Sequence, residues 1–202
     1  MPISEKKIQK KQALRKTILD FAENVASTEG WEAVTMRRIS AEIKYSLPVI
    51  YDYFKNKEEI ISTLAVKGYT ILLDELKNIV ENGQNNRQIS IDLAKAYIEF
   101  AQTHKAFYLA MYGQEGISSF MPGNPKEAER VFDFIQNWLK NLVVSNEAKI
   151  PDTWETTKLI WATLHGLIAL HNINQINDDK ISIDQVVIDF INLLLDKWEV
   201  KA

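Results

Sequence analysis

Residues 35–54 read TMRRISAEIKYSLPVIYDYF, and their pattern is the most informative in the chain. It opens with Thr35, a residue type that caps helices, and its apolar side chains then recur at helical spacing to about Ile43. Ser46 is a second capping residue, and Pro48 lies in the first turn of the helix that follows, where its missing N–H costs nothing. The stretch therefore predicts two short helices, the second ending near Tyr53, joined by a turn of three or four residues.

The same helical spacing extends over most of the chain. Gly and Pro number only 7 and 5 among 202 residues, and no segment shows the two-residue alternation of a strand. The sequence therefore predicts an all-α fold of about nine helices. They are expected over about residues 8–28, 35–43, 47–53, 56–82, 90–103, 105–112, 126–144, 151–176 and 183–198, with loops at 113–125 and 177–179.

The predicted helices divide into two domains. The first three would form a compact helix-turn-helix domain at residues 8–70, and the fourth, from about residue 57, would link it to a second helical domain at 71–202. Charge follows this division, because residues 1–60 carry a net charge of +2 and the remainder carries −5. Residues 1–16 hold six basic side chains and one acidic side chain, which form either a surface for phosphate or a solvated terminus.

Composition and spacing argue against several other classes of protein. The chain has no cysteine, so disulfides, thiolate metal sites and a cysteine nucleophile are excluded. Among three histidines, His165 and His171 lie six residues apart, about 240° around a helix, so they do not converge on a metal. No paired-carboxylate or glycine-rich phosphate motif is present, and no apolar stretch is long enough to span a bilayer. We expect a cytoplasmic protein without membrane association, catalytic activity, cofactor or metal.

Residues 35–54 and their flanks resemble the DNA-binding domain of the TetR family of regulators. Two positions depart from the usual pattern: Ser40 replaces an alanine, and Lys44 replaces a glycine in the turn. The shared pattern comprises Arg15-x-x-Ile18-Leu19-x-x-Ala22, Glu29-Gly30-Trp31, Val34-Thr35-Met36-Arg37-Arg38-Ile39, Ser46-x-Pro48-x-Ile50-Tyr51-x-Tyr53-Phe54 and Lys55-x-Lys57-Glu58-x-Ile60.

This resemblance implies a function. Its common case is a ligand-released repressor that binds a palindromic, double-stranded DNA operator as a homodimer. Some proteins of the same architecture act instead through protein partners, as nucleoid or cell-division factors without a small-molecule effector. One genomic site beside the protein's own gene would favour the repressor, and dozens of closely spaced sites would favour the partner-binding role.

The predicted recognition helix has an unusual reading surface. Its N-terminal residues should meet base edges in the major groove, and none of them is Arg, Asn or Gln. We therefore expect Leu47 and Val49 to contact thymine methyl groups, and an operator core rich in A·T pairs. Arg37, with Lys44, is left for polar contacts, and Arg37 would either read guanine or bind phosphate. The full predicted DNA-binding set is Thr35, Met36, Arg37, Lys44, Ser46, Leu47, Pro48, Val49, Tyr51, Tyr53 and Lys57, of which Thr35, Tyr51, Tyr53 and Lys57 are phosphate contacts implied by the family pattern.

The C-terminal half resembles a subset of the family with a Trp-x-x-x-His-Gly signature, here residues 161–166. The resemblance implies an effector pocket among helices five to eight and a dimer interface on the last two helices. The expected effector is small and apolar or aromatic. Each wall residue taken singly fits a core position better than a ligand contact, and only the group as a whole indicates a pocket. The predicted wall comprises Tyr97, Phe100, Phe107, Tyr108, Met111, Phe134, Trp138, Trp161 and His165. The predicted interface comprises Ile160, Leu164, Leu167, His171, Val187, Ile191, Leu195 and Trp198, with completion of one monomer core as the alternative.

Overall fold

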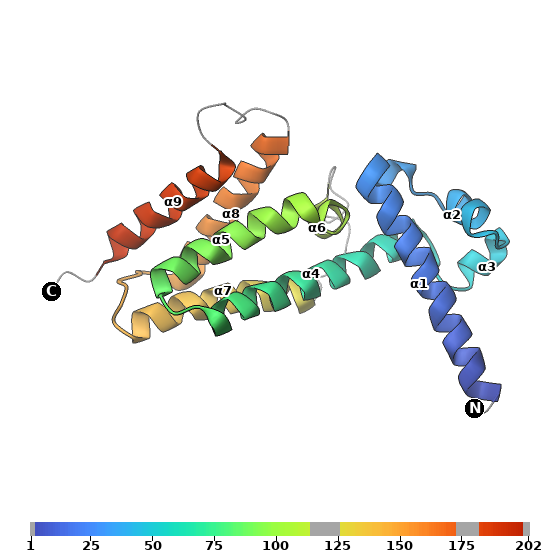
Figure 1. Ribbon diagram of the computed structural model, residues 1–202, viewed down its shortest axis with the longest axis horizontal. Coiled ribbons are helices and arrows are strands. Elements are labelled where there is room, and N and C mark those ends of the chain that lie inside the picture. Colours follow the sequence, from blue (N-terminus) through green and yellow to red (C-terminus); the bar gives the residue numbers. More distant parts are fainter. Residues whose placement is uncertain (1–2, 114–125, 173–181, 200–202) are drawn as a thin grey trace. The chain divides into compact units, whose positions relative to one another are not determined.

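The computed structural model describes residues 3–113, 126–172 and 182–199 (Figure 1). Within these ranges the chain is helical apart from its connections and one isolated bridge between Ala148 and Glu199, which confirms the predicted all-α class. The elements in order are α1 (Ile3–Glu29), the 3-10 turn η1 (Trp31–Ala33), α2 (Met36–Ile43), α3 (Leu47–Tyr51), α4 (Lys57–Asn82), α5 (Asn86–Thr103), α6 (Lys105–Tyr112), α7 (Lys126–Val144), α8 (Thr153–Asn172) and α9 (Ile183–Trp198).

Most helix ends follow local signals, and the exceptions have identifiable causes. α6, α7 and α9 have the predicted bounds. α1 ends just before Gly30, whose φ of 89° favours glycine. α5 begins at Asn86 instead of residue 90, because the Asn85 side chain caps it by accepting the N–H of Gln88 at 3.0 Å. α1 begins at Ile3 rather than near residue 8, and α3 is shorter than predicted. Three predictions fall outside the described residues: the loop at 114–125, the loop at 177–179 and the end of α8 near residue 176.

The first of two compact units comprises Met1–Gly68 and His104–Gly123, so it contains α6 as well as α1 to α3. The predicted division had placed α6 in the C-terminal domain. Two features join α6 to its unit: the Trp31 indole N–H donates to the Ala106 carbonyl at 3.2 Å, and α4 approaches α6 closely at Gly68. A Cβ at that glycine would lie only 2.9 Å from the Cβ of Phe107.

The second unit comprises Tyr69–Thr103 and Asn124–Ala202. In it α5 packs along α9, and α8 contacts α5, α7 and α9. The side chain of Arg87 joins α5 to α9 through Asn192 and Asp196. A separate apolar cluster forms where the segment after α7 meets the end of α9, and it consists of Leu139, Leu142, Ala148, Ile150 and Trp198. In the described part of the chain, no helix is long and apolar enough to cross a membrane.

Candidate nucleic-acid interface

Two sets of hydrogen bonds fix the N-terminus of α2: a cap by Thr35 and a side-chain pair between Arg38 and Glu29. The Thr35 hydroxyl caps the helix by accepting the N–H of Arg38 at 3.1 Å. The Arg38 guanidinium makes two hydrogen bonds, of 2.9 and 2.6 Å, to the carboxylate of Glu29 at the end of α1. Hydrogen bonding from Arg38 lowers the pKa of Glu29, so the pair stays charged at neutral pH. Arg38 therefore positions α2 on α1, while the adjacent Arg37 is exposed.

The turn between α2 and α3 contains both departures from the family pattern. Lys44 has left-handed backbone angles (φ 58°, ψ 38°), as a residue in the place of the usual glycine must have. The Ser40 hydroxyl donates to the carbonyl of Tyr45 at 2.6 Å, and the Tyr45 N–H donates back to the carbonyl of Ser40 at 3.2 Å. Ser40 thus closes the turn that Lys44 has to enter.

α3 is anchored by its inward-facing side chains. Ile50 is fully buried, and Phe54, just beyond the helix, is nearly so. Ser46 occupies the N-cap position, but its side chain makes no capping hydrogen bond, contrary to the prediction. The helix is instead preceded by the hydrogen-bonded turn and contains a proline in its first turn.

α4 begins at Lys57, and two hydrogen bonds between neighbouring residues stabilise this helix start. The Asn56 side chain accepts the N–H of Glu59 at 2.9 Å, and the Glu59 carboxylate accepts the N–H of Lys55 at 2.7 Å. These bonds satisfy N–H groups that a helix start leaves open. Lys57 is half-buried beside the exposed Lys55.

The predicted DNA-binding residues fall into three groups by exposure. Met36 is 8% exposed, so its side chain belongs to the core of the first unit and offers little surface to DNA. The half-buried residues are Leu47, Val49, Tyr53 and Lys57, and the exposed residues are Thr35, Arg37, Lys44, Ser46, Pro48 and Tyr51. Because Ile39 and Ile50 are fully buried, the exposed residues lie on the outer sides of α2 and α3.

The predicted effector wall is divided between the two units. Phe107, Tyr108 and Met111 are buried in the first unit. In the second unit Tyr97 and Phe100 are buried, Phe134, Trp138 and His165 are half-buried, and Trp161 is 44% exposed.

Three wall residues in the second unit form a hydrogen-bonded group. The Tyr97 hydroxyl lies 2.7 Å from Nε2 of His165, and the Trp161 indole N–H donates to that hydroxyl at 3.2 Å. Burial lowers the pKa of His165 to about 4, so the imidazole is neutral at neutral pH. The three side chains therefore form a polar group that carries no charge at neutral pH.

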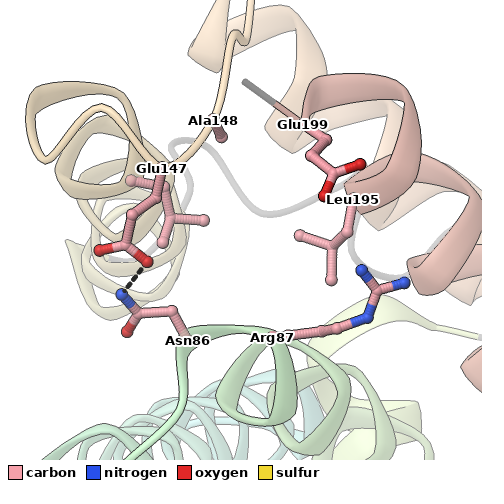
Figure 2. A pocket seen from close by; sticks show the side chains of 7 residues that line it. Asn86, Arg87, Glu147, Ala148, Leu195 and Glu199 are labelled. Atoms are coloured by element: carbon pink, nitrogen blue, oxygen red, sulfur yellow. Dashed lines mark hydrogen bonds between the residues drawn. The ribbon is translucent and has the colours of Figure 1, made fainter. Parts of the chain in front are cut away.

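A small pocket in the second unit has a different lining (Figure 2). It measures about 160 Å³ and contains none of the predicted wall residues. Asn86 and Arg87 from the start of α5 face Glu147 and Glu199 across it, and the Asn86 amide donates to Glu147 at 2.7 Å. Its volume is below the roughly 300–1,000 Å³ of usual small-molecule sites, so we do not assign the effector to it.

Half of the predicted dimer interface is buried inside the chain. Leu164, Val187, Ile191 and Trp198 each expose 6% or less of their surface, and their side chains face the core of the second unit. Ile160, Leu167, His171 and Leu195 are half-buried. The four buried residues therefore offer too little surface to a partner chain. An interface on α8 and α9 would have to use the other, exposed side chains of these helices.

Arg38 and Ser40 are the positioning residues that the sequence prediction missed. Arg38 could not be told from Arg37, because nothing in the spacing shows which of two adjacent arginines faces Glu29. Ser40 did have a signal, since it stands beside Lys44 as the second departure from the family pattern.

Comparisons with known proteins agree with this geometry. Residues 18–64 match the family described as bacterial regulatory proteins, tetR family, and residues 91–190 match the tetracyclin repressor-like C-terminal domain. The chain is 26% identical over 157 residues to the uncharacterized HTH-type transcriptional regulator YobS of Bacillus subtilis, covering 77% of this chain and 78% of that protein.

Solved structures show the same fold. A protein of unknown function from Rhodococcus sp. RHA1 matches with a TM-score of 0.79 and 21% identity, covering 93% of this chain and 96% of the other. The fatty acid degradation regulator FadR from Bacillus halodurans matches with a TM-score of 0.71 and 15% identity, covering 90% of this chain and 94% of the other.

Proposed function

Because the chain belongs to the TetR family of bacterial transcriptional regulators, we propose that it is a ligand-released repressor that binds a palindromic operator as a homodimer in the cytoplasm. The family consists of DNA-binding regulators, not enzymes. The observation that carries the proposal is the helix-turn-helix, in which Ile39 and Ile50 are buried beneath exposed residues of α2 and α3. In a dimer, two such surfaces roughly 34–36 Å apart would meet successive turns of the major groove.

Base reading would depend on two kinds of contact. Leu47 and Val49 are half-buried and Pro48 is exposed, so α3 offers mainly apolar contacts that suit thymine methyl groups. Arg37 is exposed, and among the described residues it has no ion-pair partner that would hold it away from DNA. We propose that Arg37 reads guanine next to a core rich in A·T pairs, with sequence-dependent DNA shape adding to the choice.

The test is a binding-site selection from random DNA followed by titrations against single-base variants. Arg37→Ala should weaken binding and flatten the preference at one position of each half-site, by about 1–3 kcal/mol for a lost bidentate contact. Equal weakening on every variant would make Arg37 a phosphate contact. Failure of the wild-type protein to select any site would contradict the proposed repressor itself.

Dimerisation would use an exposed apolar stripe on α8, formed by Leu159, Ala162, Gly166 and Leu170. Leu159 is 62% exposed and Leu170 is 42% exposed, although both are apolar. Outside its own turn of helix, a Cβ at Gly166 would meet no atom of the described residues within 4 Å, so packing within this part of the chain does not explain a glycine that costs a helix about 1 kcal/mol relative to alanine. Small residues at 162 and 166 would let a second helix approach closely. Leu193 on the adjacent α9, 69% exposed, would extend this surface.

Ligand release would depend on the Tyr97–His165–Trp161 group. Its hydrogen bonds and the neutral imidazole suit an uncharged or weakly polar effector among aromatic side chains. For effective release, the effector must favour the non-binding state by several kcal/mol, and about 5.5 kcal/mol would invert a 99:1 population. A screen of apolar and aromatic compounds should find ligands that raise the melting temperature and release operator DNA in the wild type but less so in Tyr97→Phe.

A further inference from the structure

The first turns of α1 carry exposed lysines that the proposed function does not use. We call residues 5–13 the N-terminal extension of α1. Lys7, Lys10 and Lys11 are exposed, as is every residue from 7 to 13. Ile18 is the first fully buried side chain among those of α1 that the structure describes. In Figure 1 this part of α1 runs on beyond α2 and α3 of the same unit.

The positive charges of the N-terminal extension destabilise the helix on which they lie. Lys7 and Lys11 are four residues apart, and Lys7 and Lys10 are three apart, so both pairs are neighbours on the helix surface and repel each other. Within the described residues, none of the three lysines has an ion-pair partner. Packing of residues 7–13 against the rest of the unit does not offset the repulsion, because all of their side chains are exposed. A polyanion would remove the repulsion and stabilise this helix.

The extension leaves the helical bundle beside the predicted DNA-binding surface. The Arg15 guanidinium lies 4.5 Å from the centroid of the Phe54 ring and donates to the Thr63 hydroxyl at 3.4 Å. Phe54 follows α3 and is adjacent to Tyr53 and Lys55, so α1 passes the junction between α3 and α4 at this point. From Arg15 back to Lys7 the helix rises about 12 Å, a length along which a duplex presents several phosphates.

We propose that the N-terminal extension is a second DNA contact, in which Lys7, Lys10 and Lys11 bind backbone phosphates of the duplex that flanks the segment read by α2 and α3. These contacts would add affinity without base preference and would lengthen the footprint. The partner is DNA rather than a membrane or a protein groove, because Ile8 is the extension's single large apolar residue and leaves no apolar face.

The test compares two triple variants of the full chain with the wild type. In the first, Lys7, Lys10 and Lys11 are changed to Gln, which preserves helix propensity. In the control, the exposed Lys126, Lys140 and Lys149 of the second unit are changed to Gln, which removes the same charge elsewhere. Affinity is measured against salt concentration on a duplex that ends at the selected site, and on one with about 10 further base pairs, one helical turn, on each side.

On the longer duplex, the first variant should lower the slope of log affinity against log salt by about two to three units per protomer, and the control should not change it. The wild type should bind the longer duplex more tightly than the shorter one, and the first variant should lose that difference. On binding the longer duplex, amide hydrogen exchange in residues 7–13 should slow.

An unchanged salt slope for the first variant would overturn the proposal. So would a loss of affinity that is equal on both duplexes, because the lysines would then not contact the flanks. Circular dichroism and melting temperature equal to those of the wild type would show that the variants fold. Failure of Arg37→Ala to weaken binding bears only on the helix-turn-helix, so the two tests fail independently.

Discussion

At the scale of single residues, two substitutions in one turn compensate each other. A non-glycine residue in the left-handed region costs roughly 1 kcal/mol, and Lys44 bears this cost. The hydrogen bond from Ser40 to the Tyr45 carbonyl, at 2.6 Å, contributes a similar amount of about 1 kcal/mol. An alanine at position 40 would lack the hydroxyl, and a glycine at position 44 would lack the strain. The two departures from the family pattern therefore form a pair.

This pairing predicts the stability of three variants. Ser40→Ala should lower the free energy of unfolding by about 1 kcal/mol, and Lys44→Gly should raise it by about 0.5 kcal/mol. The double variant should lie within about 0.5 kcal/mol of the wild type, because a lost hydrogen bond is matched by relieved strain. Urea denaturation measures all three. A Ser40→Ala variant as stable as the wild type would show that the hydroxyl does not stabilise the turn.

His165 gives the second prediction at this scale. Burial lowers its pKa to about 4, below the value of about 6.5 in an unfolded chain. The unfolded state therefore binds more protons between these values, and stability falls as the pH drops from about 6.5 towards 4. Partial exposure reduces the effect, and we expect a loss of about 1 kcal/mol at pH 5 relative to pH 7 from this residue.

His165→Gln should remove that part of the pH dependence. The measurement is the difference in unfolding free energy between variant and wild type at pH 7 and pH 5, which cancels the contributions of other groups. The difference should shrink by about 1 kcal/mol at the lower pH. A difference that is the same at both pH values would mean that the histidine is not held neutral.

At the scale of elements, α4 and α6 fit together only because residue 68 has no side chain. An added Cβ would lie 2.9 Å from the Cβ of Phe107 and 2.7 Å from the Met111 sulfur. The methionine can move, but the Phe107 Cβ is fixed to the backbone of α6. Gly68→Ala should therefore lower the free energy of unfolding by about 1–3 kcal/mol, despite the better helix propensity of alanine.

A matched substitution separates crowding from helix propensity. Gly166→Ala places the same methyl group in the middle of α8, where no atom of the described residues outside its own turn of helix lies within 4 Å. Because Gly166 lies on the proposed dimer stripe, both variants are made in the Leu159→Glu background, which disrupts that stripe. There Gly166→Ala should melt at or above the temperature of its parent, whereas Gly68→Ala should melt at a lower temperature. If both variants melted alike, α4 and α6 would not be in tight contact at this point.

The elements also show what could be predicted from the sequence. Helices flanked by strong signals, such as α9 after Ser182, have the predicted bounds, because capping is a local property. The faces of α8 could not be assigned, because the helix is apolar on most sides, and Leu164 points away from the side that carries Leu159 and Leu170. Only tertiary packing decides that Leu164 is buried and Leu159 is exposed. Likewise, the hydrogen bond between Trp31 and Ala106 of α6 joins residues 75 positions apart, so no local sequence pattern predicts it.

At the scale of the whole molecule, the proposed function depends on a second copy of the chain. The predicted interface included Leu164, Val187, Ile191 and Trp198, whose side chains are buried in the core of their own chain. The exposed stripe on α8 takes their place in the proposal, since Leu159, Ala162, Gly166 and Leu170 follow one another at helical spacing on its outer side. An apolar stripe on an exposed helix is typical of a protein interface.

Leu159→Glu should separate the dimer without unfolding the chain, because residue 159 is 62% exposed and a carboxylate there would be desolvated only by a partner. We expect the dimer dissociation constant to rise at least about tenfold and operator affinity to fall with it. Val144→Glu is the matched control, since this valine is 85% exposed at the end of α7, outside the stripe, and its variant should remain dimeric. Analytical ultracentrifugation over a range of concentrations measures both variants. A Leu159→Glu protein that sediments as the wild-type dimer would place the interface on another surface and would require a different origin for the palindromic operator.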